Sequence, residues 1–171
     1  MAKAVVALGS NLPGRFGSSE ALLGAALETL GAAGMQLLAA SAPWRSQAWP
    51  DPDAPEFRNR VALFETELPA WAVLKGLLET ERVFGRERAE VNAPRTLDLD
   101  LIDHAGAVRA GADLMLPHPR AHERLFVMGP LAEIAPEWRH PRLGRTAAEL
   151  AAAASVGLDA RPVLPRCNIR P

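Results

Sequence analysis

The chain has 171 residues, a length that suits one compact domain with its own core. Its formal net charge of −1 excludes a strong overall field that would attract nucleic acid or an anionic membrane. A single cysteine, Cys167, excludes an internal disulfide and a cysteine-based zinc site. The apolar run at the N-terminus is too short for a signal sequence or a membrane span. We therefore expect a globular protein of the cytoplasm.

Apolar periodicity and turn residues divide the chain into strands and helices. In chain order, the predicted elements are a strand at 3–8, a helix at 18–30, strands at 35–44 and 57–68, a helix at 69–84, a strand at 96–103, a short irregular strand within 109–116, and helices at 123–135 and 146–154. Loops are predicted at 47–56, which holds three prolines, and at 86–94. Residues from about 160 onward are predicted to form a tail.

The predicted order, β-α-β-β-α-β, is that of the split βαβ arrangement. We therefore expect an α+β fold: a ferredoxin-like βαββαβ core with an antiparallel sheet and additional C-terminal helices. No segment has the composition of a linker, so residues 1–171 are expected to form a single domain. Because this fold hosts many functions, the function has to be argued from the site.

The strongest local signal is the segment Arg95–Ile102, which reads RTLDLDLI. In a strand, alternate side chains share a face, so Asp98 and Asp100 would stand together while the leucines pack into the core. Two like charges on neighbouring positions of one face repel each other and need compensation. A divalent-cation site and a charged strand that faces solvent or pairs with arginines explain this pattern equally well.

The loop before this strand is rich in arginine. Arg86, Arg88 and Arg95 flank it, and guanidinium groups bind phosphate oxygens in bidentate fashion. On its own, a solvated charged loop explains these residues better than a binding site does. Beside Asp98 and Asp100, they are typical of the charged clamp that a polyphosphate needs.

Three weaker signals remain open at this level. Glu81 lies on the apolar stripe of its predicted helix, where it needs either an ion pair with a nearby arginine or a ligand hydroxyl. Phe57 and Asn59 share one strand face and suit a flat heterocycle, although such a pair is more often core plus a turn contact. His118 lies between two prolines and, with His122, lacks the third ligand that a zinc site requires.

Together these segments resemble the 6-hydroxymethyl-7,8-dihydropterin pyrophosphokinases of folate biosynthesis. The matching segments, in family order, are ALGSN (7–11), WRS (44–46), FRN (57–59), ERVFGRER (81–88), PRTLDLDLI (94–102), LPHPRAHERLF (116–126) and PLAEIAP (130–136). The resemblance implies the ferredoxin-like core, a monomer, two Mg²⁺ ions and ATP as co-substrate. It also implies transfer of pyrophosphate from ATP to the hydroxymethyl group of the pterin, with release of AMP.

The resemblance assigns roles residue by residue. The matched positions are Asp98 and Asp100 as ligands of both metal ions; Arg86 and Arg95 as catalytic arginines that steady the transferring group; Glu81, Arg88, His118 and Arg124 as ATP contacts; and Ser46, Trp49, Phe57, Asn59 and Phe126 as pterin contacts, with the rings of Phe57 and Phe126 on its two faces. No residue is matched to a general base.

Three segments depart from the common family pattern. The triplet 91–93 (VNA) stands where many members have Arg-Trp-Gly, and that tryptophan helps to close the site. The triplet 46–48 (SQA) replaces a common Thr-Pro-Pro and leaves that loop less rigid. Phe57 replaces a frequent tyrosine, which keeps the stacking face and removes the hydroxyl.

Two other functions are compatible with the same residues. One is a binding protein that holds a pterin or nucleotide without catalysis, and the retained arginines and aspartates argue against it. The other is a metal-dependent nucleotidyltransferase, which would release pyrophosphate and attach a nucleotide to its acceptor. The identity of the nucleotide product separates this second function from pyrophosphate transfer.

Overall fold

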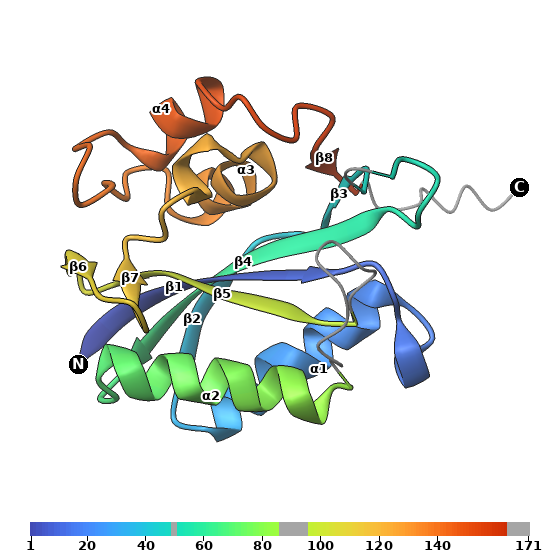
Figure 1. The fold of residues 1–171 in the computed structure, drawn as a ribbon, viewed down its shortest axis with the longest axis horizontal. Coiled ribbons are helices and arrows are strands. Elements are labelled where there is room, and N and C mark those ends of the chain that lie inside the picture. The colour runs from blue at the N-terminus through green and yellow to red at the C-terminus, as the bar shows by residue number, and fades with distance from the viewer. Residues whose placement is uncertain (49–50, 86–95, 164–171) are drawn as a thin grey trace, which may run out of the picture.

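The computed structural model describes residues 1–48, 51–85 and 96–163. The strands are β1 (Ala2–Ser10), β2 (Gln36–Ala40), β3 (Trp44–Ser46), β4 (Phe57–Thr66), β5 (Asp98–His104), β6 (Arg109–Ala110), β7 (Met115–Leu116) and β8 (Arg161–Pro162). The helices are α1 (Ser19–Ala32), α2 (Ala70–Val83), α3 (Leu125–Ile134) and α4 (Ala147–Ala152), with 3₁₀ turns η1 (Gly14–Phe16) and η2 (Ala121–Glu123). They form three layers: α1 and α2 cover one face of the sheet, and α3 and α4 cover the other (Figure 1).

The main sheet has the strand order β5-β1-β4-β3-β8, and β2 also pairs with β4. Every pairing in it is antiparallel. The chain order β1-α1-β2-β4-α2-β5 is the predicted βαββαβ core, and the α+β fold class is confirmed. The predicted cap is also present, because the Ser18 hydroxyl accepts a hydrogen bond from the Ala21 N–H at 3.1 Å.

The strand predicted at 35–44 is wrong as a single element, because it is divided into β2 and β3. Both strands pair with β4, but Ser41 lies between them, opposite Val61. The Ser41 hydroxyl accepts from the Val61 N–H at 3.1 Å and takes the place of a backbone carbonyl. Pro43 follows and has no N–H to continue the ladder. The interruption gives β3 its own register, with Ser46 opposite Phe57.

Two apolar cores lie on the two faces of the sheet. The larger core lies between the sheet and helices α1 and α2, and it contains Leu99 and Leu101 of β5 and the preceding Leu97. The smaller core contains Val5 and Val61 of the sheet, packed against α3 and α4. As predicted, the leucines of β5 are buried on the face opposite its aspartates.

The C-terminal third differs from the predictions in two places. Instead of one helix at 123–135, η2 and α3 are separated by Arg124, whose backbone is extended. Pro130 lies inside α3, and the helix continues through it. The predicted tail from about 160 begins with a strand instead, because β8 pairs with Trp44 and Arg45 of β3.

Within the described ranges, no helix has both the length and the apolar character needed to cross a membrane.

Candidate active site

The predicted site residues meet where β1, β4 and β5 share one end of the sheet. Gly9 lies opposite Asp98 of β5 on one side and opposite Asn59 of β4 on the other. A Cβ at Gly9 would lie 3.4 Å from Asn59 Oδ1, 3.9 Å from Phe57 Cδ1 and 4.0 Å from Asp98 Cβ. The predicted metal ligand and two predicted pterin contacts therefore surround one glycine on one face of the sheet.

Asp100 lies two residues further along the same face of β5, and His118 and Arg124 are close to it among the described residues. Its Oδ2 lies 3.9 Å from His118 Nε2 and 4.0 Å from Arg124 Nη1. The Asp100 side chain is 35% exposed, so solvent reaches it. Across the described ranges, no group of three or more His, Cys, Asp or Glu side chains is arranged to hold a metal ion.

His118 is held by the backbone around it. Its N–H donates to the Ile102 carbonyl of β5 at 2.9 Å, and its Nδ1 accepts from the Arg120 N–H at 3.3 Å. Burial lowers the pKa of His118 below its ordinary value, Asp100 opposes that shift, and Arg124 adds to it. A neutral ring that accepts at Nδ1 carries its proton on Nε2, which is the atom that faces Asp100.

A polar pair lies at the β3 side of Gly9. Asn59 Nδ2 donates to Ser46 Oγ at 2.9 Å, and both side chains are buried. This bond turns the amide so that Oδ1 points toward Gly9. Phe57 lies opposite Ser46 in the β3–β4 register and is half-buried. The structure thus brings together three of the predicted pterin contacts, namely Ser46, Phe57 and Asn59.

Phe126, the second predicted ring, is on α3 and connects to the carboxylates through Arg124. The Arg124 guanidinium carbon lies 5.7 Å from the centre of the Phe126 ring. On another side, the ring lies against Gly157, where a Cβ would be only 2.4 Å from Phe126 Cδ1. Helix α3 is itself fixed to the sheet by Glu133, which accepts from the Trp44 indole at 2.9 Å and from the Ala42 N–H at 2.7 Å.

Glu81 is in α2, on the other face of the sheet, and one of its carboxylate oxygens binds the backbone of β5. Its Oε1 accepts from the backbone N–H of Leu99 at 2.7 Å, and the residue is 3% exposed. The bond fixes β5 between its two aspartates.

Some predicted residues lie outside the described ranges. They are Trp49, Arg86, Arg88 and Arg95, together with the departing triplet 91–93. Their roles stay predictions from the resemblance.

Gly9 is the site residue that sequence reasoning missed, although its segment was recognised as ALGSN. A glycine inside a strand often marks a place where a ligand or another chain segment comes close to the backbone. Gly157 and Asp159 were also missed, because both were placed in or next to a featureless tail. The positive φ of Gly157, +68°, is a backbone property that no side-chain pattern displays.

Known proteins share both this sequence pattern and this fold. The family model "7,8-dihydro-6-hydroxymethylpterin-pyrophosphokinase (HPPK)" matches residues 5–136. A 2-amino-4-hydroxy-6-hydroxymethyldihydropteridine pyrophosphokinase of Synechocystis is 40% identical over 147 residues, which cover 86% of this chain and 73% of that protein. The enzyme of the same name from Methylorubrum extorquens is 38% identical over 138 residues, 80% of this chain and 85% of that one.

A solved structure supports the fold alone. The wild-type HPPK-DHPS of Plasmodium falciparum with pteroate has a TM-score of 0.66 at 11% identity and covers 88% of this chain. This chain spans 44% of that larger one.

The chain belongs to the 7,8-dihydro-6-hydroxymethylpterin-pyrophosphokinase family. The resemblance inferred from the sequence motifs is therefore confirmed, and so is the expectation of an enzyme of the pyrophosphokinase class.

Proposed function

We propose that this protein transfers pyrophosphate from ATP to the hydroxymethyl group of 6-hydroxymethyl-7,8-dihydropterin, and releases AMP, as a step of folate biosynthesis. The observation that carries the proposal is the arrangement around Gly9. Carboxylates on one side of it and an aromatic–amide pair on the other place a phosphate-binding group next to a heterocycle-binding group. That juxtaposition is what transfer between a nucleotide and a heterocyclic alcohol requires.

Asp98 and Asp100 are the proposed ligands of two Mg²⁺ ions. Aspartate oxygens suit Mg²⁺, which binds through one or two carboxylates, keeps several waters and takes substrate phosphate oxygens. A donor set of two carboxylates fits that requirement. When bound, the ions supply neutralisation of phosphate charge and fix the polyphosphate relative to the acceptor.

The phosphate side of the site is assigned to cationic residues. Arg124 and His118 face Asp100 from the loop before α3, so they can contact phosphate oxygens held near that carboxylate. Arg86, Arg88 and Arg95 are proposed for the same charged clamp on the basis of their family positions. Glu81, also matched to an ATP contact, supports this side through its bond to Leu99.

The pterin side is assigned to the opposite flank of Gly9. The rings of Phe57 and Phe126 are proposed to stack on the two faces of the pterin, and Asn59 and Ser46 to bind its polar edge. The Asn59–Ser46 bond supports this role because it orients the amide before a ligand arrives. Trp49 is proposed to contribute an apolar contact.

The reaction needs positioning more than acid–base chemistry. The pterin hydroxymethyl oxygen forms a bond to the β-phosphorus, the bond from that phosphorus to the α,β-bridging oxygen breaks, and AMP leaves with the electron pair. The hydroxyl proton is released to solvent in the same process. Asp98, Asp100 and the neighbouring cations hold the reacting groups in line while charge redistributes. A monomer in the cytoplasm is the proposed working state.

The product pattern tests this function. Purified protein is incubated with Mg²⁺, ATP and the pterin alcohol, and nucleotides and pterins are separated by chromatography. We expect AMP and the pterin pyrophosphate in equal amounts. Free pyrophosphate with a nucleotide attached to the pterin would establish the nucleotidyltransferase instead. Binding of both ligands without either product would identify a protein that has lost catalysis.

A further inference from the structure

The segment Ser155–Val163, called the C-terminal arm below, contacts both ends of the proposed pterin site. It follows α4 and ends as β8 on the edge of β3 (Figure 1). Gly157, within the arm, lies against the Phe126 ring. The sequence suggested no function for the second half of the arm. The arm contacts the segment that carries Phe126 and the segment that carries Ser46. These two proposed pterin contacts lie about 80 residues apart in sequence.

The first half of the arm is bound to the segment that carries Arg124 and Phe126. The N–H groups of Ser155 and Val156 both donate to the Glu123 carbonyl at 3.0 Å, and the Leu125 N–H donates to the Val156 carbonyl at 2.9 Å. The backbone on either side of Arg124 is therefore paired with the arm. This pairing accounts for the extended conformation of Arg124 between η2 and α3.

Gly157 then makes room for the Phe126 ring. Its φ of +68° is a conformation that side-chain-bearing residues rarely adopt, and a Cβ there would lie 2.4 Å from Phe126 Cδ1 and 2.9 Å from Cε1. Both distances are shorter than any van der Waals contact. The ring position of Phe126 therefore depends on the absence of a side chain at Gly157.

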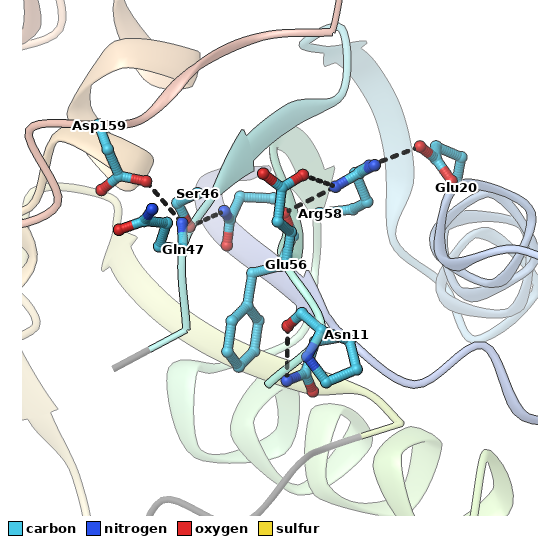
Figure 2. A network of polar contacts seen from close by, with 10 residues as sticks. Asn11, Glu20, Ser46, Gln47, Glu56, Arg58 and Asp159 are labelled. Carbon is cyan, nitrogen blue, oxygen red and sulfur yellow. Dashed lines mark hydrogen bonds and ion pairs between the residues drawn. The ribbon is translucent and has the colours of Figure 1, made fainter. Parts of the chain in front are cut away.

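The second half of the arm is bound to the segment that carries Ser46. A turn closed by the Ala160 N–H on the Gly157 carbonyl, at 3.0 Å, brings Asp159 next to β3. Asp159 Oδ2 accepts from the backbone N–H of Gln47 at 2.5 Å (Figure 2). That N–H belongs to the peptide unit that follows Ser46, so the carboxylate fixes the plane of this peptide.

A small pocket and a strand pairing complete this junction. The pocket, of about 180 Å³, is lined by Arg45, Ser46, Gln47, Glu56, Asp159 and Arg161. The Val163 N–H donates to the Pro43 carbonyl at 2.8 Å and continues the β8–β3 pairing. The arm and β3 are thus held together by strand pairing next to the Asp159–Gln47 bond.

We infer that the C-terminal arm is a positioning element of the pterin site, in which Gly157 sets the place of the Phe126 ring and Asp159 sets the orientation of the Ser46–Gln47 peptide. The inference rests on the proposed function, because Phe126 and Ser46 are proposed pterin contacts. The arm itself is assigned no contact with the substrate. The contacts at Gly157 and Asp159 act on pterin binding. The pairing of Ser155 and Val156 with Glu123 and Leu125, which also supports the proposed ATP contact Arg124, is separate from these two contacts.

Steady-state kinetics with each substrate varied in turn test this inference. Asp159→Ala removes the acceptor for the Gln47 N–H, and we expect a five- to twenty-fold increase in the pterin KM, since one lost charged hydrogen bond corresponds to about tenfold in affinity. The ATP KM should change less than twofold. Asp159→Asn keeps an acceptor oxygen and should recover most of the loss. Gly157→Ala should raise the pterin KM at least as much, because the ring has to move.

Leu158→Ala is the matched control in the same turn, since Leu158 is 67% exposed. It should leave both KM values unchanged. If Asp159→Ala and Gly157→Ala leave the pterin KM within twofold, or raise both KM values equally, the positioning role is wrong. Urea unfolding of each variant separates general destabilisation from a local effect.

Phe126→Ala distinguishes failure of this inference from failure of the proposed site. A large increase in the pterin KM for Phe126→Ala, without one for the arm variants, would overturn the positioning role and leave the proposed pterin site intact. No change for Phe126→Ala would overturn both.

Discussion

Alternate residues of strand β5 lie on its two faces, and the two faces have different roles. One packs into the apolar core, and the other carries the carboxylates of the proposed site. Leu97, Leu99 and Leu101 are buried against α1 and α2, whereas Asp98 and Asp100 lie half-buried on the opposite face. The first face is continuous apolar core. The second is core only where α3 and α4 cover it, and near Gly9 it becomes polar. Because side chains alternate between the two faces of a strand, substitutions can alter stability on one face and chemistry on the other almost independently.

The largest expected effect is on activity, from the polar face. Asp98→Asn or Asp100→Asn should reduce turnover by about 1,000-fold, since loss of a metal ligand removes several kcal/mol of charge stabilisation and about 1.4 kcal/mol equals tenfold. The unfolding free energy should change by less than about 1 kcal/mol, as is usual for side chains outside the core. AMP release and urea unfolding measure the two quantities. Near-wild-type turnover in either variant would refute the metal assignment.

The apolar face should show the reverse pattern. Leu99→Ala is expected to lower the unfolding free energy by about 3 kcal/mol, because a buried leucine is replaced and a cavity remains. Its effect on activity should follow only the fraction of molecules that stay folded. The urea midpoint measures the loss. A cost under about 1 kcal/mol would show that this face does not hold β5 in place.

Substitution of Glu81, which binds the backbone of β5 between Asp98 and Asp100, should have a smaller effect on the unfolding free energy. Glu81→Ala leaves the buried Leu99 N–H without its acceptor, so we expect a loss of about 2 kcal/mol in unfolding free energy. Glu81→Gln keeps an acceptor oxygen and should lose much less. Equal losses in the two variants would mean that the charge of Glu81, rather than this hydrogen bond, stabilises β5.

The smallest expected effect is on the pH dependence of the unfolding free energy, and it involves His140. Burial, with His122 and Arg142 nearby, lowers the pKa of His140, so the unfolded chain binds more protons than the folded chain below about pH 6.5. His140 therefore stabilises the fold above that pH, and this contribution is lost as the pH falls through its folded pKa. His118, whose pKa is also lowered, acts in the same direction.

Unfolding at pH 7.5 and 5.5 checks this effect. His140→Asn provides a side-chain oxygen for the Arg142 and Leu143 N–H groups that now donate to His140 Nδ1. The variant should lose less stability than wild type between the two pH values. An identical loss would mean that His140 does not contribute to the pH dependence.

Most of the fold could be predicted because local signals agreed with it. Ser18 marks the start of α1 because its hydroxyl caps the helix three residues away. The alternation of leucine and aspartate marks β5 as a strand. The break between β2 and β3 could not be predicted, since it depends on a hydroxyl bonding across to Val61. The strand β8 could not be predicted either, because two residues have no period and gain their conformation from pairing with β3.

The site was predictable where residues are close in sequence and less so where the fold brings them together. The spacing of Asp98 and Asp100 predicts that they share a face. Their proximity to Gly9 and Arg124 depends on strand register and on the backbone before α3. The bond from the Leu99 N–H to Glu81 was not predicted, because a backbone N–H on another element leaves no trace in the side-chain pattern.

The bulge in β5 has a consequence for how the strand can change in length. Between Val5 and Val6 of β1 the partner shifts from Asp103 to Leu101, so Ile102 is an additional residue in the ladder. Inserting or deleting one residue between Asp98 and Asp100 would place the two carboxylates on opposite faces of the strand and turn one of them toward the apolar core. At Ile102 the strand already accommodates an extra residue, downstream of both aspartates. The extra residue therefore leaves the spacing of the two carboxylates unchanged.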